Sequence, residues 1–522
     1  MKGFQAPCPS CAAPVRFKIS SSLVAVCEFC HSVVARTDRK LEDRGKIAAI
    51  VETNSPLHLG VKGKVGGKSF ELVGRTQYQH AAGGRWDEWY AALSNGKWGW
   101  LAEAQGRFYL TTEREFREGE SVPQWESLSV GETAIGPDGG TWTVAETGVA
   151  TPIAAAGEIP FALEPNTAHR YADLYAPGKK FATFDYSDSA PKAYLGREMT
   201  LDELGVPVTV LSLDDEDRKI GGVALSCPQC GGSLTLHAPD QAERVGCPSC
   251  GALLDCNQGK LEYLKTLHKL DADPLIPLGK VGTWGGVEYT VIGFMKRSTI
   301  EEDIEYPWFE YLLYNPRAGF RWLVQSNAQW SFVEPVAPGD VSAGTSSRAY
   351  DGTTYKLFQR GLATVRYVVG EFYWRVEVGE EVYTADFIAP PKMLSLERST
   401  VVASPDSEGK PQAQEIQFSL ATYAQPEEIE QAFGVQHLPR GWFIAPNRPN
   451  PVDWRVFIAW GGFLALLAVV DIVLGSVFHK NGDRFFFGLA LVLVSLVPIG
   501  TLVYYFNFES SRWKSSNLAD SE

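Results

Sequence analysis

The sequence predicts a mainly β protein with two zinc ribbons and a C-terminal two-helix transmembrane hairpin. Three observations lead to this fold class: two cysteine quartets, short strand patterns between turn residues, and an apolar C-terminal region. Each ribbon is expected to precede a small β-barrel or sandwich-like domain. The expected parts are residues 1–37 (ribbon), 55–215 (β domain), 222–258 (ribbon), 273–445 (β domain) and 454–508 (transmembrane hairpin).

The charge balance argues against a nucleic-acid partner. The 522 residues carry 62 acidic and 48 basic side chains, which gives a formal net charge of -14. Nucleic-acid binding depends on Lys and Arg that neutralise phosphates, so none is expected here. The first residues contain no apolar segment of the secretory type, so no secretory signal is expected either.

Eight of the nine cysteines form two metal-ligand motifs, C-x2-C-x15-C-x2-C and C-x2-C-x16-C-x2-C. In each pair a tight turn points both sulfurs at one ion, and four thiolates complete a tetrahedral site with no open position. We therefore expect two structural Zn²⁺ ions per chain. The predicted ligands are Cys8, Cys11, Cys27 and Cys30, and Cys227, Cys230, Cys247 and Cys250.

Two other interpretations of these motifs stay open at the level of sequence. Iron in a rubredoxin-like site uses similar turns, and disulfides would need an oxidising compartment, for which the sequence gives no sign. Cys256 has no partner in either motif and is expected to act as a small apolar side chain. In the first motif, Ala12 and His31 stand where the second has glycine.

The two ribbons belong to an internal duplication. The cysteines of the two quartets are offset by 219 or 220 positions, and further identities follow at offsets of 222 and 213. Small steps in offset are what insertions in loops produce, so we expect two related halves followed by the hairpin. The matched positions include Trp86/Trp308, Glu88/Glu310, Trp100/Trp322 and Gly157-Glu158/Gly370-Glu371.

Each half contains short runs with strand periodicity. The predicted strands are Lys68–Val73, Trp89–Leu93, Trp98–Leu101 and Arg107–Leu110, and then Val287–Ile292, Phe309–Leu313, Phe320–Leu323 and Gln329–Phe332. A glycine is expected to end the first run of each half. Short helices are predicted at Leu41–Thr53, Leu261–Leu267 and Pro426–Phe433.

This arrangement resembles an uncharacterised bacterial family that is known only as a domain of unknown function. The resemblance rests on Ser-Pro-Leu at 55–57, Gly-x-Ser-Phe-Glu-Leu-Val-Gly-Arg at 67–75, Glu-Trp-Tyr at 88–90 and Gly-Trp-Leu at 99–101. It implies a bacterial, zinc-bearing protein, sometimes encoded near envelope-stress and membrane-associated genes. It implies no activity and no catalytic residues.

No catalytic constellation is found, so the protein is not expected to be an enzyme. The segment 63–69 resembles a phosphate-binding loop, but its spacing is one residue short and it continues into a strand rather than a helix. The eight histidines recur at no matched position in the two halves. A histidine-based active site shared by both halves is therefore absent.

The repeated aromatic residues and a repeated carboxylate form a second candidate site. Two interpretations stay open: the rings fill the barrel cores, or they line a groove for a peptide or cationic ligand. The residues concerned are Trp86, Glu88 and Trp100 in the first half and Trp308, Glu310 and Trp322 in the second.

Two apolar runs, at about 455–478 and 485–507, are each roughly 33 Å long as helices, which is enough to cross a bilayer. A six-residue link joins them, so an antiparallel hairpin is expected; a hairpin buried in a soluble core is the alternative. More cations flank the outer ends than the link, which predicts that both termini are cytoplasmic at a bacterial inner membrane. Asp471 is the intramembrane polar residue. Two interpretations stay open: its side chain takes part in a relay or contacts a partner, or it is tolerated because it can extend toward the link at the membrane surface.

From these features we expect a membrane-anchored, cytoplasm-facing zinc-ribbon scaffold or adaptor that binds protein partners in an envelope or membrane-stress setting. The alternative is a membrane-coupled sensor of a small or polycationic ligand. An enzyme of unknown reaction comes third.

Overall fold

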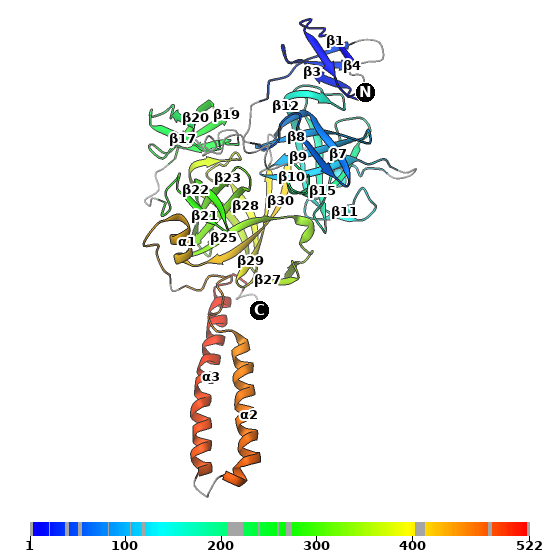
Figure 1. Cartoon of the computed structure of the whole chain (residues 1–522). Coiled ribbons are helices and arrows are strands. Elements are labelled where there is room, and N and C mark those ends of the chain that lie inside the picture. Colours follow the sequence, from blue (N-terminus) through cyan, green and yellow to red (C-terminus); the bar gives the residue numbers. More distant parts are fainter. Residues whose placement is uncertain are drawn as a thin grey trace.

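The protein is mainly β, with helices at its C-terminal end (Figure 1). The computed structural model describes residues 4–19, 21–36, 41–50, 55–81, 83–104, 106–116, 121–206, 223–238, 241–257, 260–267, 274–401, 413–441, 443–478 and 483–518.

The first half forms a closed antiparallel barrel of eight strands, the first barrel. Its order is β7-β8-β9-β10-β15-β14-β13-β12, and β12 pairs back onto β7. The strands are β7 (Lys68–His80), β8 (Arg85–Leu93), β9 (Trp98–Ala104), β10 (Arg107–Glu113), β12 (Thr141–Ile159), β13 (His169–Ala176), β14 (Lys180–Asp185) and β15 (Lys192–Met199).

The second half repeats this topology as the second barrel. Its order is β22-β23-β24-β25-β30-β29-β28-β27, and β27 pairs back onto β22. The strands are β22 (Val287–Glu301), β23 (Ile304–Asn315), β24 (Gly319–Ser326), β25 (Gln329–Val336), β27 (Thr353–Phe372), β28 (Glu381–Ala389), β29 (Lys392–Val401) and β30 (Ala413–Ala424). Between the barrel and sandwich expected from the sequence, the strand pairing selects the barrel.

Short elements complete the two halves. The hairpin strands are β6 (Lys62–Val65), β11 (Thr133–Ile135), β21 (Val281–Trp284) and β26 (Ser347–Tyr350), and single 3-10 turns lie at Trp125–Ser127 and Pro338–Asp340.

All eight predicted strands are confirmed, but the expectation that a glycine ends the first strand of each half is wrong. β7 and β22 continue through Gly74 and Gly293 by way of a β-bulge. A Cβ at Gly74 would lie 1.9 Å from the Glu158 carbonyl oxygen, and one at Gly293 would lie 2.5 Å from that of Glu371. Glycine is needed because the long strand of each barrel passes too close for a side chain.

Two of the three predicted helices are wrong. Leu41–Lys46 forms β5 and pairs with β4, while 51–54 lies outside the described residues. Lys260–Thr266 forms β20 and pairs with β19. In both places an open strand edge of a ribbon satisfies the backbone hydrogen bonds, which outweighs the local helical pattern. The third helix, α1 (Pro426–Phe433), is confirmed.

Each ribbon is a pair of small hairpins joined to the long strand of its own barrel. Ribbon 1 comprises β1 (Phe4–Pro7), β2 (Pro14–Phe17), β3 (Val24–Val26), β4 (Ser32–Arg36) and β5; ribbon 2 comprises β16 (Val223–Ser226), β17 (Ser233–Leu236), β18 (Arg244–Gly246), β19 (Ala252–Asn257) and β20. β3 pairs with the end of β12, and β18 pairs with the end of β27. The strands β3–β5 and β18–β20 therefore extend the barrel sheets, whereas β1-β2 and β16-β17 form separate two-stranded sheets.

The two barrels pack against each other through their outer faces. Side chains of β13 and β14, such as Leu174 and Phe184, share one apolar core with Leu394 and Phe418 from β29 and β30. Because side chains alternate along a strand, the neighbours of these residues point into the barrels.

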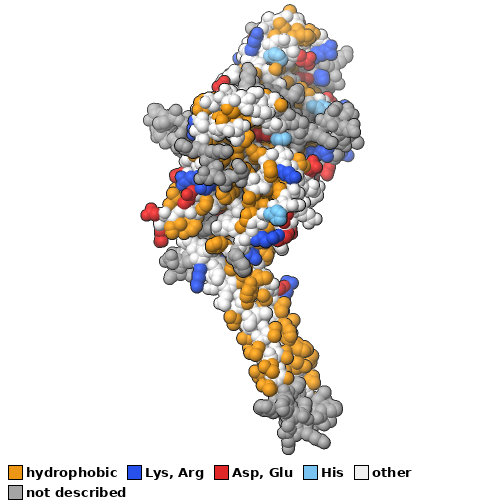
Figure 2. Space-filling view, turned by 90° about the vertical axis from the view of Figure 1, so that its left-hand side faces the viewer, with side chains coloured by type: hydrophobic (Ala, Val, Ile, Leu, Met, Phe, Trp, Pro, Cys, Tyr) orange, Lys and Arg blue, Asp and Glu red, His pale blue; other side chains and the backbone are white. Residues whose placement is uncertain are grey.

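The C-terminal helices α2 (Trp454–Phe478) and α3 (Asp483–Lys514) lie side by side and extend away from the second barrel (Figure 1). Apolar side chains cover the visible face of this extension (Figure 2). Among the described residues one helical segment, Gly488–Lys514 of α3, is long and apolar enough to cross a membrane. Asp471 lies on α2; its side chain and the link residues 479–482 fall outside the described part of the chain.

The end of α3 docks on the second barrel. Arg512 is 1% exposed and donates hydrogen bonds to the backbone oxygens of Pro446 and Arg448 at 3.3 and 2.6 Å. Ser516 donates to the carbonyl oxygen of Phe358, and Asn517 donates to that of Arg360 at 2.7 Å. Since Phe358 and Arg360 belong to β27, the long strand of the second barrel is tied to α3.

Candidate functional site

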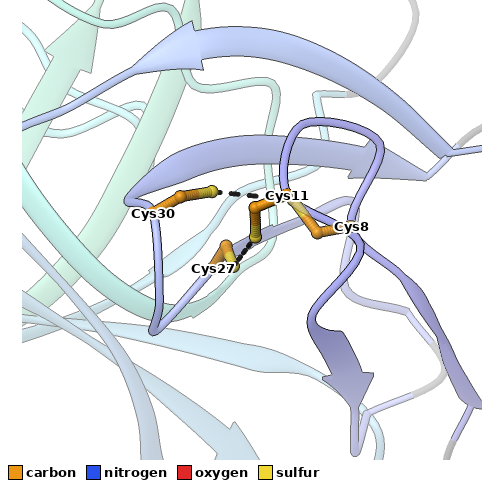
Figure 3. Close-up of side chains that lie close together, drawn as sticks. All are labelled: Cys8, Cys11, Cys27 and Cys30. Carbon is orange, nitrogen blue, oxygen red and sulfur yellow. Dashed lines mark hydrogen bonds between the residues drawn. The ribbon is translucent and has the colours of Figure 1, made fainter.

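Each predicted cysteine quartet is assembled in space. The cysteine pairs occupy the turns of the two hairpins in each ribbon, and all four sulfurs of a quartet lie within 4.8 Å of one another. Figure 3 shows the quartet of ribbon 1. The Sγ–Sγ distances are 3.7 Å for Cys8–Cys30 and Cys11–Cys27, and 3.9 Å for Cys227–Cys250 and Cys230–Cys247.

These distances fit a metal ion. Four sulfurs at about 2.3 Å from a central zinc form a tetrahedron with edges of about 3.8 Å. A disulfide would bring two sulfurs to about 2 Å. Each quartet could therefore hold one metal ion, while Cys256 is buried and belongs to neither quartet.

The turns that present the sulfurs share one backbone form. In all four, the residue after the second cysteine donates its N–H to the carbonyl of the first and has a positive φ. The φ values are 60° at Ala12, 56° at His31, 70° at Gly231 and 71° at Gly251. Ribbon 1 thus places two non-glycine residues in a conformation that favours glycine.

We expect Ala12→Gly or His31→Gly to stabilise ribbon 1 by about 0.5–1 kcal/mol. Glycine removes the energetic cost of a positive φ at a residue with a Cβ, and this gain exceeds the cost of the extra conformational entropy of the unfolded chain. The denaturant midpoint for metal release to a colorimetric chelator measures this. Gly231→Ala in ribbon 2 is the matched control and should shift that midpoint in the opposite direction; equal shifts would contradict the explanation.

Protonation of the thiols depends on their surroundings. Hydrogen bonds with the side chain and backbone of Ser32 lower the pKa of Cys30 to about 6, whereas burial raises the pKa of Cys8 and of Cys247. Metal binding must displace the remaining protons, so loading of both quartets is expected to weaken in acid.

A buried glutamate of each barrel holds the loop between the two cysteine pairs of its ribbon. Glu158 accepts hydrogen bonds from the backbone N–H groups of Lys18 and Ile19 at 2.7 and 3.0 Å and from the Ser22 hydroxyl at 2.6 Å. Glu371 accepts from the N–H groups of His237 and Ala238 at 2.7 and 2.8 Å. The duplicated Gly-Glu pair was visible in the sequence, but nothing there pointed to this anchoring role.

The six residues of the predicted aromatic site line one cavity of about 2130 Å³. They come from inward-facing positions on β8, β9, β23 and β24. The four tryptophans are half-buried, whereas Trp89 and Trp330 form the buried cores on the other side of the sheets. The residues that meet at this cavity are Trp86, Glu88, Trp100, Trp308, Glu310 and Trp322.

In the second barrel an arginine lies between two carboxylates. Arg297 is 5% exposed, and its Nη1 lies 3.3 Å from Glu310 Oε1 and 2.7 Å from Glu397 Oε1. Trp308 donates its Nε1–H to Glu310 at 2.6 Å, and the guanidinium carbon lies 5.7 Å from the Trp308 ring centroid. Sequence reasoning missed Arg297 and Glu397, because the contacting residues are 100 positions apart.

The first barrel has carboxylates at the two equivalent positions but lacks the arginine. Tyr78 is opposite Trp86 on β7 and β8, as Arg297 is opposite Trp308 on β22 and β23. Asp185 occupies on β14 the place of Glu397 on β29. Burial, and then the charge of Asp185, raise the pKa of Glu88 to about 7.

A second pair of facing residues also has one more carboxyl group in the first barrel than in the second. Asp173 accepts from Thr183 at 2.7 Å, and its counterpart Asp386 accepts from Ser395 at 2.6 Å. Asp386 also accepts from the Gln359 amide at 2.7 Å. Glu146 is opposite Asp173 on β12 and β13, as Gln359 is opposite Asp386 on β27 and β28. Burial and then the charge of Glu146 raise the pKa of Asp173. At these matched interior positions the first barrel therefore has more carboxyl groups and lacks the cation of the second.

We expect Glu88→Gln to stabilise the protein at pH 8 by about 1–3 kcal/mol and to have a smaller effect at pH 5. The folded state binds the Glu88 proton more tightly than the unfolded chain, so this group's contribution to stability falls as pH rises from about 4.5 to about 7. Chemical denaturation at the two pH values measures the difference. Glu164→Gln, at an exposed position, is the control; an equal gain at both pH values would contradict the assigned pKa.

Comparison with known proteins places the two halves in one family. Residues 58–201 and 277–422 each match Domain of unknown function (DUF4178). No curated protein and no solved structure matches the chain. The two matches together cover more than half of the sequence and contain most strands of each barrel. The chain therefore belongs to the DUF4178 family and carries two copies of its domain, each preceded by a four-cysteine cluster.

Proposed function

We propose that this protein is a membrane-attached receptor whose barrels bind a small ligand, which corresponds to the sensor interpretation of the sequence. The observation that carries the proposal is the cavity of about 2130 Å³ at the inward faces of the barrels. Eight-stranded barrels are wide enough to hold one small ligand. Aromatic walls with a few converging polar groups are typical of such sites.

The metal clusters serve structure in this proposal. Each would hold one Zn²⁺, because four thiolates leave no position for a reacting water. The anchoring glutamates Glu158 and Glu371 tie each metal-stabilised loop to the long strand of a barrel. No enzymatic reaction is part of this proposal.

The helices would attach the receptor to a bacterial inner membrane. We infer that α2 and α3 both cross it as a hairpin, with the barrels and both termini on the cytoplasmic side. The support is the length of α2, 25 residues, its antiparallel course beside α3, and the excess of cations at the barrel end.

A truncation before Trp454 tests this attachment. The truncated protein is expected in the soluble fraction and the full chain in the membrane fraction. If the truncated protein stays with membranes in high salt, the helices are not the sole attachment and the topology is wrong.

A scaffold or adaptor that binds a protein partner is the second candidate. One observation favours it: Phe29, between Cys27 and Cys30 at the tip of ribbon 1, is 68% exposed. Ribbon 2 has Ser249 at the equivalent position. Exposed aromatic residues are enriched in protein interfaces.

Crosslinking in native membranes followed by purification of the full chain separates the two candidates. Mass spectrometry is expected to find a co-purifying small molecule. Ala102→Phe should reduce its amount, because Ala102 lines the cavity next to Glu88, its partner on the neighbouring strand. Thr112→Phe places the same ring at an exposed position of β10 and should have no effect. One dominant protein partner, lost in Phe29→Ser and without a small molecule, would favour the adaptor.

A further inference from the structure

The duplication provides an internal comparison for the cavity. In the second barrel, the carboxylates of Glu310 and Glu397 are bridged by a guanidinium, that of Arg297, beside the Trp308 ring. This is direct evidence of the kind of group that this pair of positions accommodates. A guanidinium can donate several hydrogen bonds to carboxylates and lie against an aromatic ring.

The first barrel keeps the recognition groups and lacks their cation. Glu88, Asp185 and Trp86 stand at the equivalent positions, and Tyr78 replaces Arg297. The Tyr78 ring stacks on Trp86 at a centroid distance of 5.4 Å and carries no charge. Glu88 accepts a hydrogen bond from the Tyr90 hydroxyl at 3.4 Å, and among the residues that the structure describes it has no cationic partner.

We propose that the first barrel binds the guanidinium group of a small molecule, held by Glu88 and Asp185 beside Trp86, in the manner in which the second barrel holds Arg297. This inference rests on the proposed function and names the chemical class of its ligand.

The remaining charges around the site are compatible with a cation. Glu146 and Asp173 add two further carboxyl groups to the same cavity. His80 lies 3.3 Å from Glu146 Oε1, and burial lowers the pKa of His80 and of His169. Arg107 is paired with Glu198, so it does not serve Glu88. Within the described residues, only the cysteine quartets bring three or more ligand atoms together for a metal ion, so the site fits an organic cation better than a bare metal.

Calorimetry on the full chain in lipid nanodiscs tests the inference with two probes that differ in one group. Arginine methyl ester carries the guanidinium, and citrulline methyl ester carries a neutral urea of similar shape. We expect the arginine ester to bind at least ten-fold more tightly. Glu88→Gln and Asp185→Asn should each weaken its binding at least ten-fold.

Tyr78→Arg is the decisive variant, because it gives the first barrel the built-in guanidinium of the second. It is expected to fold, as judged by circular dichroism, and to lose binding of the arginine ester. If the Tyr78→Arg variant does not fold, the test is decided by whether Glu88→Gln weakens binding of the arginine ester. Retained binding in a folded Tyr78→Arg, or in both carboxylate variants, would overturn the inference.

The two proposals can fail separately. Equal affinity for the two esters, or no binding of either, would overturn the guanidinium inference. If a co-purified small molecule sensitive to Ala102→Phe is nevertheless found, the receptor proposal stands without it. If no small molecule is found and neither ester binds, both proposals are wrong.

Discussion

Replacing Cys247 with serine is expected to remove one of two zinc ions per chain and to unfold ribbon 2. Metal binding and folding are coupled in units of this size, where zinc contributes about 10–16 kcal/mol. The remaining three sulfurs cannot complete a closed tetrahedral site. Elemental analysis of the purified full chain should fall from two zinc ions to one.

Cys256→Ala is the matched control for this experiment. Cys256 is buried in the same apolar cluster as Cys247 but lies outside the quartet, so the variant should keep two zinc ions. Iron in place of zinc, or less than one zinc per unaltered chain, would show that the metal assignment is wrong. Two zinc ions in Cys247→Ser would show that the quartet is not the site.

The second large effect is expected for Glu371→Gln. The Glu371 side chain is buried, at 2% exposure, and its carboxylate accepts two backbone N–H groups of ribbon 2. An amide keeps one acceptor oxygen and turns its NH₂ group toward the second donor. The loss of one charge-assisted hydrogen bond, and the weakening of the other to a neutral one, should destabilise the attachment of ribbon 2 by about 2–5 kcal/mol.

Hydrogen exchange measured by mass spectrometry should report this loss as faster exchange over residues 233–246, with the barrel strands unchanged. Glu381→Gln is the control, because Glu381 is exposed at the first position of β28. Unchanged exchange in Glu371→Gln would mean that strand pairing between β18 and β27 alone holds the ribbon.

The features that could be predicted from the sequence are those determined by residues close together in the chain. Cysteines two residues apart report a turn directly, and the alternation in Lys68–Val73 reports a strand before its partner is known. The wrong helix at Leu261–Leu267 shows the opposite case. Leu261 and Leu264 have helical spacing, yet the segment pairs with β19 and leaves Leu264 43% exposed. The available strand edge outweighed the local pattern.

What could not be predicted depends on contacts between distant residues. Closure of the first barrel brings β7 beside β12, and closure of the second brings β22 beside β27. This closure decides which side chains meet inside each barrel. The contact between Arg297 and Glu397 follows from that closure and has no local signal. Comparison of the two halves could have found the Tyr78 and Arg297 exchange, but only with the strand register in hand.

β27 also has a mechanical consequence. This strand of 20 residues is about 66 Å long if fully extended; residues near its beginning contact the end of α3, and its last residues pair with ribbon 2. It is hydrogen-bonded on both sides, so it cannot slide by one residue without exchanging its inward and outward side chains. The C-terminal helices and ribbon 2 are therefore attached to one continuous strand, so a force on α3 would act on the same strand that holds the metal cluster.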